Sequence, residues 1–364
     1  MTELDQKGVL PMDCEVEQWS VLRLLQQRSR AARLEQCLRS DDWLEVMHRE
    51  YLASFVRGGG AAVKVVVPMT EGCRPAILTG LASLAEEEGF VFASVDAAST
   101  KVHLIDKVFE KVAAQVPWRE LASSYMRHLL ARNGLKLPEQ GNDFNLAWLA
   151  AQNEQEESLL RLEVTKWLTR DLVRASGMCQ EFRFAMVRMC MGTIDPNEQP
   201  SQDVIEEWLR GELRLISALK SALIFQKIGR HNARHILLSL MRWIRIAGKN
   251  GLILTIDISR YMVDRRPKVP NGSLYYSRPA TLEAYEVLRQ LIDGTDDMEG
   301  CLMAVVATSE FLVDGRRGLE SYDALNSRVR DEVYDRNLPN PLSSLVRISG
   351  EPERLGCVDR EGSL

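Results

Sequence analysis

The sequence predicts an α/β fold with a parallel sheet, and three apolar runs carry this prediction. Residues 62–67 and 90–96 flank a helical segment at 76–88, and strand, helix and strand in this order are typical of a βαβ unit. The third run, GLILTIDISRYM at 251–262, rises through Leu and Ile to a single aspartate, Asp257. A continuous apolar run indicates a strand covered on both faces, and an acid at its carboxyl end lies where open α/β sheets bind ligands.

The chain before the first strand is predicted to be helical, with residues 1–56 forming an N-terminal helical region. Apolar residues recur at helical spacing, and Ser40, Asp41 and Asp42 are expected to cap the helix that contains Trp43. Three consecutive glycines at 58–60 then end the helical pattern, because glycine disfavours a helix interior.

Residues 68–75 (PMTEGCRP) occupy the position of a phosphate-binding loop, between the first strand and its helix. A working loop reads G-x-x-x-x-G-K-[ST], with glycines for backbone contacts to phosphate, a lysine, and a hydroxyl for Mg²⁺. Here Pro68 and Cys73 replace the glycines, Arg74 replaces the lysine and Pro75 replaces the hydroxyl. Arg74 can still contact an anion, but Pro75 cannot bind magnesium. Ile258 follows Asp257 where a P-loop enzyme has a glutamate to polarise water, so we do not expect ordinary Mg-ATP hydrolysis.

A long helical insertion is expected to divide the α/β core. We predict helices at 102–116, 118–133, 143–149, 154–175, 181–191 and 202–219, all with apolar residues at i, i+3 or i+4. The expected organisation is a first half of a P-loop-like core at 57–100, a helical insertion at 101–235 and a second half of the core at 236–350. That second half contains a helix at 281–293 and a buried strand at 301–308, and the chain fades into an acidic tail after Leu342, with residues 351–364 disordered.

The segment from Lys227 to Lys268 has ten basic and two acidic residues, so it carries about +8 in a chain whose net charge is −5. One interpretation is a nucleic-acid contact, with Tyr275 and Tyr276 able to stack on bases. The alternative is a solvated basic face that packs on acidic parts of the same protein. The candidate nucleic-acid-binding residues are Arg230, Arg234, Arg260, Arg265, Arg266 and Lys268.

Metal, disulfide and membrane chemistry are not expected. His231 and His235 have the spacing of a helical zinc pair, but Asn232 stands where the zincin glutamate would be, so we interpret them as polar or capping residues. Seven scattered cysteines without a C-x-x-C spacing argue against a disulfide framework or a thiolate zinc site. No apolar run is long enough to span a membrane, and MTELDQKGVL is no signal peptide, so we expect a cytoplasmic protein.

Several motifs together resemble a known family. They are FVRGGGAAVKVVV, FASVDAA, ARHILLSLMRWIRIAGKNGLILTID, YEVLRQLID and VVATSEFLVDGRRGLESYDALNSRV, which span residues 55–348. The chain is similar to the BrxD-like P-loop ATP-binding proteins of bacteriophage-exclusion (BREX) and related defence systems, a divergent AAA+/STAND branch. The resemblance implies an AAA+-like core that works beside other defence proteins and near DNA. It also places a degenerate nucleotide site on Gly72, Cys73, Arg74, Pro75, Asp257 (the Walker B aspartate) and Thr308 (the sensor-strand polar residue).

Three functions are open from the sequence. The first is a non-catalytic or weakly nucleotide-binding AAA-like subunit, a pseudo-ATPase that serves as scaffold or regulator in a phage-defence complex. The second is an ATP-binding switch or ATPase that uses Asp257 and requires ATP and Mg²⁺. The third is a DNA-binding module that acts through residues 227–268. AAA-like folds often form rings, so a homo-oligomer is also possible, with Arg316, Arg317 or Arg328 completing a neighbour's site or serving only as surface charges.

Overall fold

A six-stranded, all-parallel sheet forms the centre of the protein and confirms the predicted α/β class. The computed structural model describes residues 37–70, 72–139, 144–263, 272–330 and 339–350. The strand order is β1-β6-β2-β5-β4-β3, so β5 separates the strand before the phosphate-loop position from the strand that ends in Asp257. The strands are β1 Leu38–Arg39, β2 Ala61–Pro68, β3 Val91–Asp96, β4 Leu252–Asp257, β5 Cys301–Val306 and β6 Leu345–Ser349.

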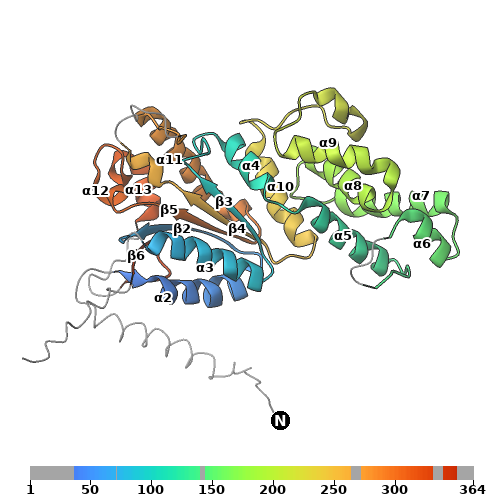
Figure 1. Ribbon diagram of the computed structural model, residues 1–364, viewed down its shortest axis with the longest axis horizontal. Helices are drawn as coiled ribbons and strands as arrows, with labels where there is room; N and C mark the ends of the chain where they lie inside the picture. The colour runs from blue at the N-terminus through green and yellow to red at the C-terminus, as the bar shows by residue number, and fades with distance from the viewer. Residues whose placement is uncertain (1–36, 71, 140–143, 264–271, 331–338, 351–364) are drawn as a thin grey trace, which may run out of the picture.

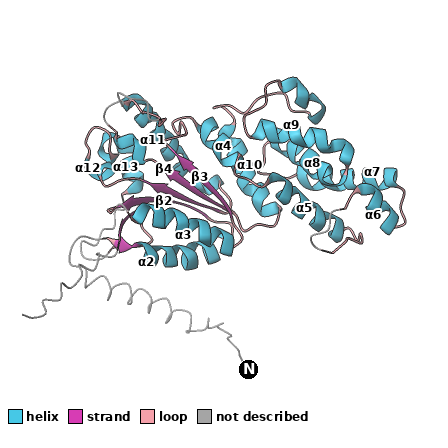
Figure 2. Ribbon diagram, in the orientation of Figure 1, coloured by secondary structure: helices cyan, strands magenta, loops and turns pink. Residues whose placement is uncertain are grey.

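Helices cover both faces of the sheet (Figures 1 and 2). Every residue of β4 and β5 is buried, as the continuous apolar runs predicted. Neighbouring residues of β2 point into different cores: Val66 packs with the helices of one face, and Val65 and Val67 pack with those of the other. The first face is covered by α2 Ser40–Val46, the π-helical segment η1 Met47–Val56 and α3 Cys73–Glu87. The second is covered by α4 Ile105–Ala113, α10 Ala233–Ile246, α11 Arg278–Asp293, α12 Glu310–Val313 and α13 Asp323–Val329.

A lobe of helices extends from the sheet between β3 and β4 (Figure 1). Its apolar residues join the core of the second face in one continuous cluster. The predicted helix at 202–219 is wrong in its second half, because α9 ends at Leu209 and Gly211 takes a left-handed φ of 75°. The elements of the lobe are α5 Trp118–Arg132, α6 Leu146–Gln152, α7 Glu157–Leu168, η2 Thr169–Val173, α8 Gln180–Ile194, η3 Pro196–Glu198, α9 Gln199–Leu209 and η4 Ile216–Ala222.

Two of the strands, β1 and β6, were not predicted from the sequence. The chain does not fade after Leu342: β6 enters the sheet between β1 and β2, and its Val346 and Ile348 pack into the core beneath α2 and α3. Five residues with only two buried apolar positions give a weak periodic signal, which explains the error. The expected cap at residues 40–42 is also wrong, since α2 starts at Ser40 and Arg39 is its N-cap.

The remaining short helices are η5 Ser259–Met262, η6 Thr295–Asp297 and η7 Leu319–Ser321. Within the described residues, none of the helices combines the length and the apolar composition that a membrane span needs. The helices expected before residue 37 and the tail at 351–364 lie outside the described part of the chain.

Candidate nucleotide site

The carboxyl ends of the parallel strands meet at one edge of the sheet and bring the predicted site residues together. Asp257 is the last residue of β4, and Thr308 follows the end of β5 by two positions. Asp96, the last residue of β3, lies opposite Asp257 in the strand register. Asp96 was not predicted as a site residue, although its strand, FVFASVD, ends in an aspartate as LILTID does. Its Oδ1 accepts a hydrogen bond from the backbone N–H of Ala98 at 2.7 Å.

Residues of the phosphate-loop segment are hydrogen-bonded to the end of β6. The backbone N–H of Met69 donates to the carbonyl of Ile348 at 2.8 Å. The Thr70 hydroxyl accepts a hydrogen bond from the N–H of Gly350 at 3.1 Å and lies 2.9 Å from the thiol of Cys73. Cys73 is buried, so the second glycine position of the motif now contributes a side chain to the core. The loop is therefore closed by contacts within the chain on the side of β6.

Gly72 is the N-cap of α3 and its φ is −69°, a value that any residue adopts. A Cβ atom at this position would meet no heavy atom within 4 Å. The open space beside Gly72 lies next to the first backbone N–H groups of α3, where helices attract anions. One element of a phosphate site, a helix amino terminus at the strand edge, is thus retained.

Arg74 forms an ion pair with Asp257. Its Nη2 contacts Asp257 Oδ2, and the other carboxylate oxygen accepts a hydrogen bond from the N–H of Ser259 at 2.9 Å. The Asp257 side chain is 4% exposed and that of Arg74 is 38% exposed. A buried carboxylate needs a cation or several donors to offset its lost hydration, and Arg74 supplies the charge. The cation at the lysine position and the carboxylate at the Walker B position therefore neutralise each other.

The groups around this pair differ from those of a P-loop enzyme at the position after Asp257. Ile258, which stands at the glutamate position, is 1% exposed and its backbone N–H donates to the carbonyl of Val306 at 2.8 Å. Thr308 Oγ1 is buried and makes no hydrogen bond of standard geometry, yet the hydroxyl lies close enough to Glu310 to lower the pKa of that carboxyl. Within the described residues, the edge thus retains Asp257, Asp96 and Thr308 but has no second acid directly after Asp257.

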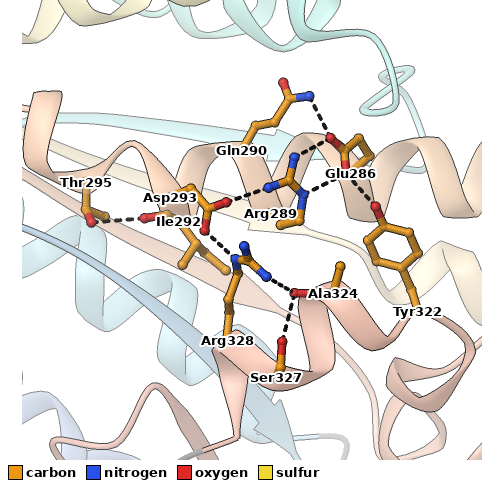
Figure 3. A network of polar contacts seen from close by, with 10 residues as sticks. All are labelled: Glu286, Arg289, Gln290, Ile292, Asp293, Thr295, Tyr322, Ala324, Ser327 and Arg328. Carbon is orange, nitrogen blue, oxygen red and sulfur yellow. Dashed lines mark hydrogen bonds and ion pairs between the residues drawn. The ribbon is translucent and has the colours of Figure 1, made fainter.

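Two of the motifs that carried the family resemblance meet in a polar network between α11 and the α13 region (Figure 3). Glu286 accepts hydrogen bonds from Arg289, Gln290 and Tyr322. The bonds from Arg289 are the main cause that lowers the pKa of Glu286 to about 2. Asp293 pairs with both Arg289 and Arg328. The network fixes α11 against α13, so these motifs have a structural role here.

The three arginines considered for a neighbouring subunit's site differ in the exposure of their side chains and in the contacts these make within the chain. Arg317 is 5% exposed and donates to the carbonyl oxygens of Tyr261 and Tyr276 at 3.1 and 2.9 Å, which contradicts a role in another subunit. Arg328 is exposed but bound to Asp293, and Arg316 is exposed.

The basic segment is largely engaged with the rest of the protein. Arg242 and Arg245 share Glu299, and Lys249 pairs with Glu120. Tyr276 is buried and its hydroxyl donates to the Thr100 carbonyl, so it cannot stack on a base.

The structure describes three of the six candidate nucleic-acid-binding residues. Arg230 is exposed, Arg234 is half-buried beside Gly294, and Arg260 donates to the carbonyl of Leu274 at 2.8 Å. Arg265, Arg266 and Lys268 lie outside the described residues. The histidines do not share a helix, because α10 begins at Ala233, after His231. In the part of the chain that the structure describes, no cluster of metal-binding side chains occurs.

Comparison with known proteins identifies a family. The model of the protein family described as BREX system ATP-binding protein BrxC/D matches residues 54–351. The range starts in η1, ends just after β6, and includes Arg74, Asp257 and Thr308. Neither a curated protein nor a solved structure matches the chain.

Proposed function

This chain belongs to the BREX system ATP-binding protein BrxC/D family, and on that premise we propose that it is a non-hydrolysing AAA-like subunit of a prokaryotic phage-defence system. In this role it serves as a scaffold or regulator that binds other defence proteins. Its parallel sheet and helical lobe supply a stable framework for such contacts, and the nucleotide edge supplies little chemistry.

The observation that carries the proposal is the ion pair between Arg74 and Asp257. Phosphoryl transfer depends on a cation at the β- and γ-phosphates, a metal ion held by the protein and a group that orients the attacking water. Here the cation contacts the metal-binding carboxylate, Pro75 provides no hydroxyl, and Ile258 cannot orient water. Each of the three requirements is lost for a separate reason, which favours loss of hydrolysis as a whole.

The test is Mg-ATP binding by calorimetry and thermal shift, for the wild-type protein and for Asp257→Ala. The matched control is Asp195→Ala, because Asp195 is also a buried carboxylate (3% exposed) paired with a partly exposed arginine, Arg161 (40% exposed), but lies in the helical lobe. The proposal predicts no saturable binding up to millimolar nucleotide in any of the three proteins. Micromolar binding that is lost in Asp257→Ala and kept in Asp195→Ala would contradict it.

Micromolar binding that depends on Asp257 would favour an ATP-dependent switch, and one observation supports this alternative. Arg74 is 38% exposed, so its guanidinium can leave Asp257 and turn to a phosphate group, which it can bind through two parallel hydrogen bonds. Asp257 would then be free to hold Mg²⁺ beside Asp96. In this alternative nucleotide replaces an internal ion pair, and its binding stabilises the protein by mass action.

A DNA contact through the basic segment is compatible with either role. Arg230 is exposed near the start of α10, and it offers a cation to a phosphate backbone. The expected signature is an affinity that falls steeply with salt concentration, with a smaller slope in an Arg230→Ala, Arg265→Ala, Arg266→Ala variant. An unchanged slope would exclude this segment as the contact.

A further inference from the structure

A pocket of about 670 Å³ lies between α5, η2 and α10, away from the strand ends that carry Asp257. Of these elements, α5 and α10 lie where the helical lobe meets the sheet (Figure 1), and η2 lies within the lobe between α7 and α8. The pocket borders Gly248, which precedes β4, whereas Asp257 ends that strand. Six residues of strand separate the two ends by about 20 Å, so this pocket is distinct from the nucleotide edge.

The walls of the pocket carry a surplus of positive charge. Arg132 and Arg242 line it directly, together with Asp171. Asp171 is shared by Arg132 and Arg170, as Glu299 is shared by Arg242 and Arg245. Of these groups only Arg132, Arg242 and Asp171 line the pocket, so its wall carries one net positive charge. The Nε atom of Arg242 is buried and has no hydrogen-bond partner within the described structure.

The Tyr125 side chain adds a hydrogen-bonding group to the wall of the pocket. Tyr125 is 6% exposed, its ring packs against Trp243, and it lines the pocket. Its hydroxyl has no hydrogen-bond partner among the described residues and is not fully buried, so a ligand in the pocket can reach it. Burial raises the pKa of Tyr125, so the hydroxyl stays protonated at neutral pH and can donate a hydrogen bond. The arrangement offers a neutral hydrogen-bond donor beside two arginines.

We propose that this pocket binds a small phosphorylated molecule, whose phosphate contacts Arg132, Arg242 and the Tyr125 hydroxyl. A phosphate monoester carries nearly two negative charges at neutral pH and three terminal oxygens, so it can contact Arg132 and Arg242 together, whereas a carboxylate offers one charge and two oxygens. Leu129 and Ile246 provide an apolar wall for the organic part of the ligand. The volume is in the range of small-molecule sites. A ligand held here would bridge the helical lobe and α10, which is tied through Arg245 to the backbone of Val56 at the end of η1.

The experiment uses phenyl phosphate as the probe, titrated by calorimetry into the full-length protein. The variants are Tyr125→Phe, which keeps the ring and its packing, and Arg242→Met. The control is Arg188→Met: Arg188 is 36% exposed and pairs with Glu198, as Arg242 is 36% exposed and pairs with Glu299, but it lies outside the pocket. Circular dichroism and thermal melting establish that each variant is folded.

The expected result is saturable binding by the wild-type protein and by Arg188→Met. Binding should weaken at least about tenfold in Tyr125→Phe and in Arg242→Met, because each variant loses a hydrogen bond to the charged phosphate. Benzoate should bind at least about tenfold more weakly than phenyl phosphate, since it carries one charge fewer. The proposal is overturned if the wild-type protein does not saturate, if folded Tyr125→Phe binds as tightly as wild type, or if benzoate binds equally well.

Discussion

The ion pair between Arg74 and Asp257 predicts a specific pattern of stability changes. Replacing Arg74 by Met removes the cation and leaves a carboxylate that is 4% exposed with one backbone donor, the N–H of Ser259. Replacing Asp257 by Asn removes the buried charge and leaves an arginine that is 38% exposed and can be hydrated. Arg74→Met should therefore destabilise the fold more than Asp257→Asn, because only the first change leaves a buried charge without compensation.

The size of the coupling follows from the burial of the two partners. Breaking a fully buried pair costs about 3–5 kcal/mol, and exposed pairs contribute about 0.2–1 kcal/mol. Since solvent reaches more than a third of Arg74 but almost none of Asp257, we expect a coupling free energy of about 1–3 kcal/mol.

The assay is urea unfolding of the wild-type protein, both single variants and the double variant. The exposed pair Lys249 and Glu120, with 35% and 62% exposed side chains, provides a reference cycle through Lys249→Met and Glu120→Gln. Its coupling should be below about 1 kcal/mol. The dependence of the unfolding free energy on urea must stay constant across the variants for the cycle to hold. A coupling between Arg74 and Asp257 no larger than the reference, or a greater loss in Asp257→Asn than in Arg74→Met, would refute the reasoning.

Three further predictions concern the stability of the fold. Gly251 has a φ of 147°, and a Cβ there would lie 2.1 Å from the carbonyl oxygen of Gly300. Gly251→Ala should therefore lower the unfolding free energy by more than about 2 kcal/mol, and a urea midpoint equal to that of wild type would contradict this. Arg317→Met removes donors from two buried carbonyl groups and should cost about 2 kcal/mol in the same assay, with no loss if the carbonyls find other partners. The folded pKa of Glu286 is about 2, below its unfolded value, so its contribution is complete above about pH 4.3 and is lost as the pH falls toward 2. Glu286→Gln should therefore lower the unfolding free energy by about 1 kcal/mol at pH 7, because the Glu286 side chain is 35% exposed and its ion pair is partly screened. This difference from wild type should shrink between about pH 4.3 and 2. A difference that stays constant over this range would exclude the carboxylate charge as its source.

The central strands β4 and β5 were predictable because a run of apolar residues indicates a strand that is buried on both faces. β4 and β5 are buried at every position, and no helical periodicity competes with the strand pattern. β6 was not predictable in the same way, because this strand of five residues buries only Val346 and Ile348 and follows the loop after Leu342. Its place between β1 and β2 depends on long-range pairing, which no local pattern encodes.

The sequence assigned the candidate site to strand ends that the structure brings together at one edge of the sheet, but it did not give the contacts of these residues. Asp257 and the phosphate-loop segment could be assigned from strand ends and spacing, and the loss of lysine and glutamate was visible directly. That Arg74 would turn to Asp257 instead of toward solvent depends on how α3 packs beside β4. The partners of Arg242 and Arg317 were hidden for the same reason, since a count of charges along the chain does not reveal which of them meet in space.

The most direct test of the proposed function is steady-state ATP hydrolysis, measured as phosphate release with Mg²⁺ by the purified protein and by Asp257→Ala. An enzyme of ordinary efficiency turns over about once per second or faster. A subunit whose Arg74 and Asp257 neutralise each other should release phosphate at the background rate, and Asp257→Ala should be indistinguishable from it. Turnover above background in the wild-type protein that disappears in Asp257→Ala would show that this edge of the sheet is a working nucleotide site.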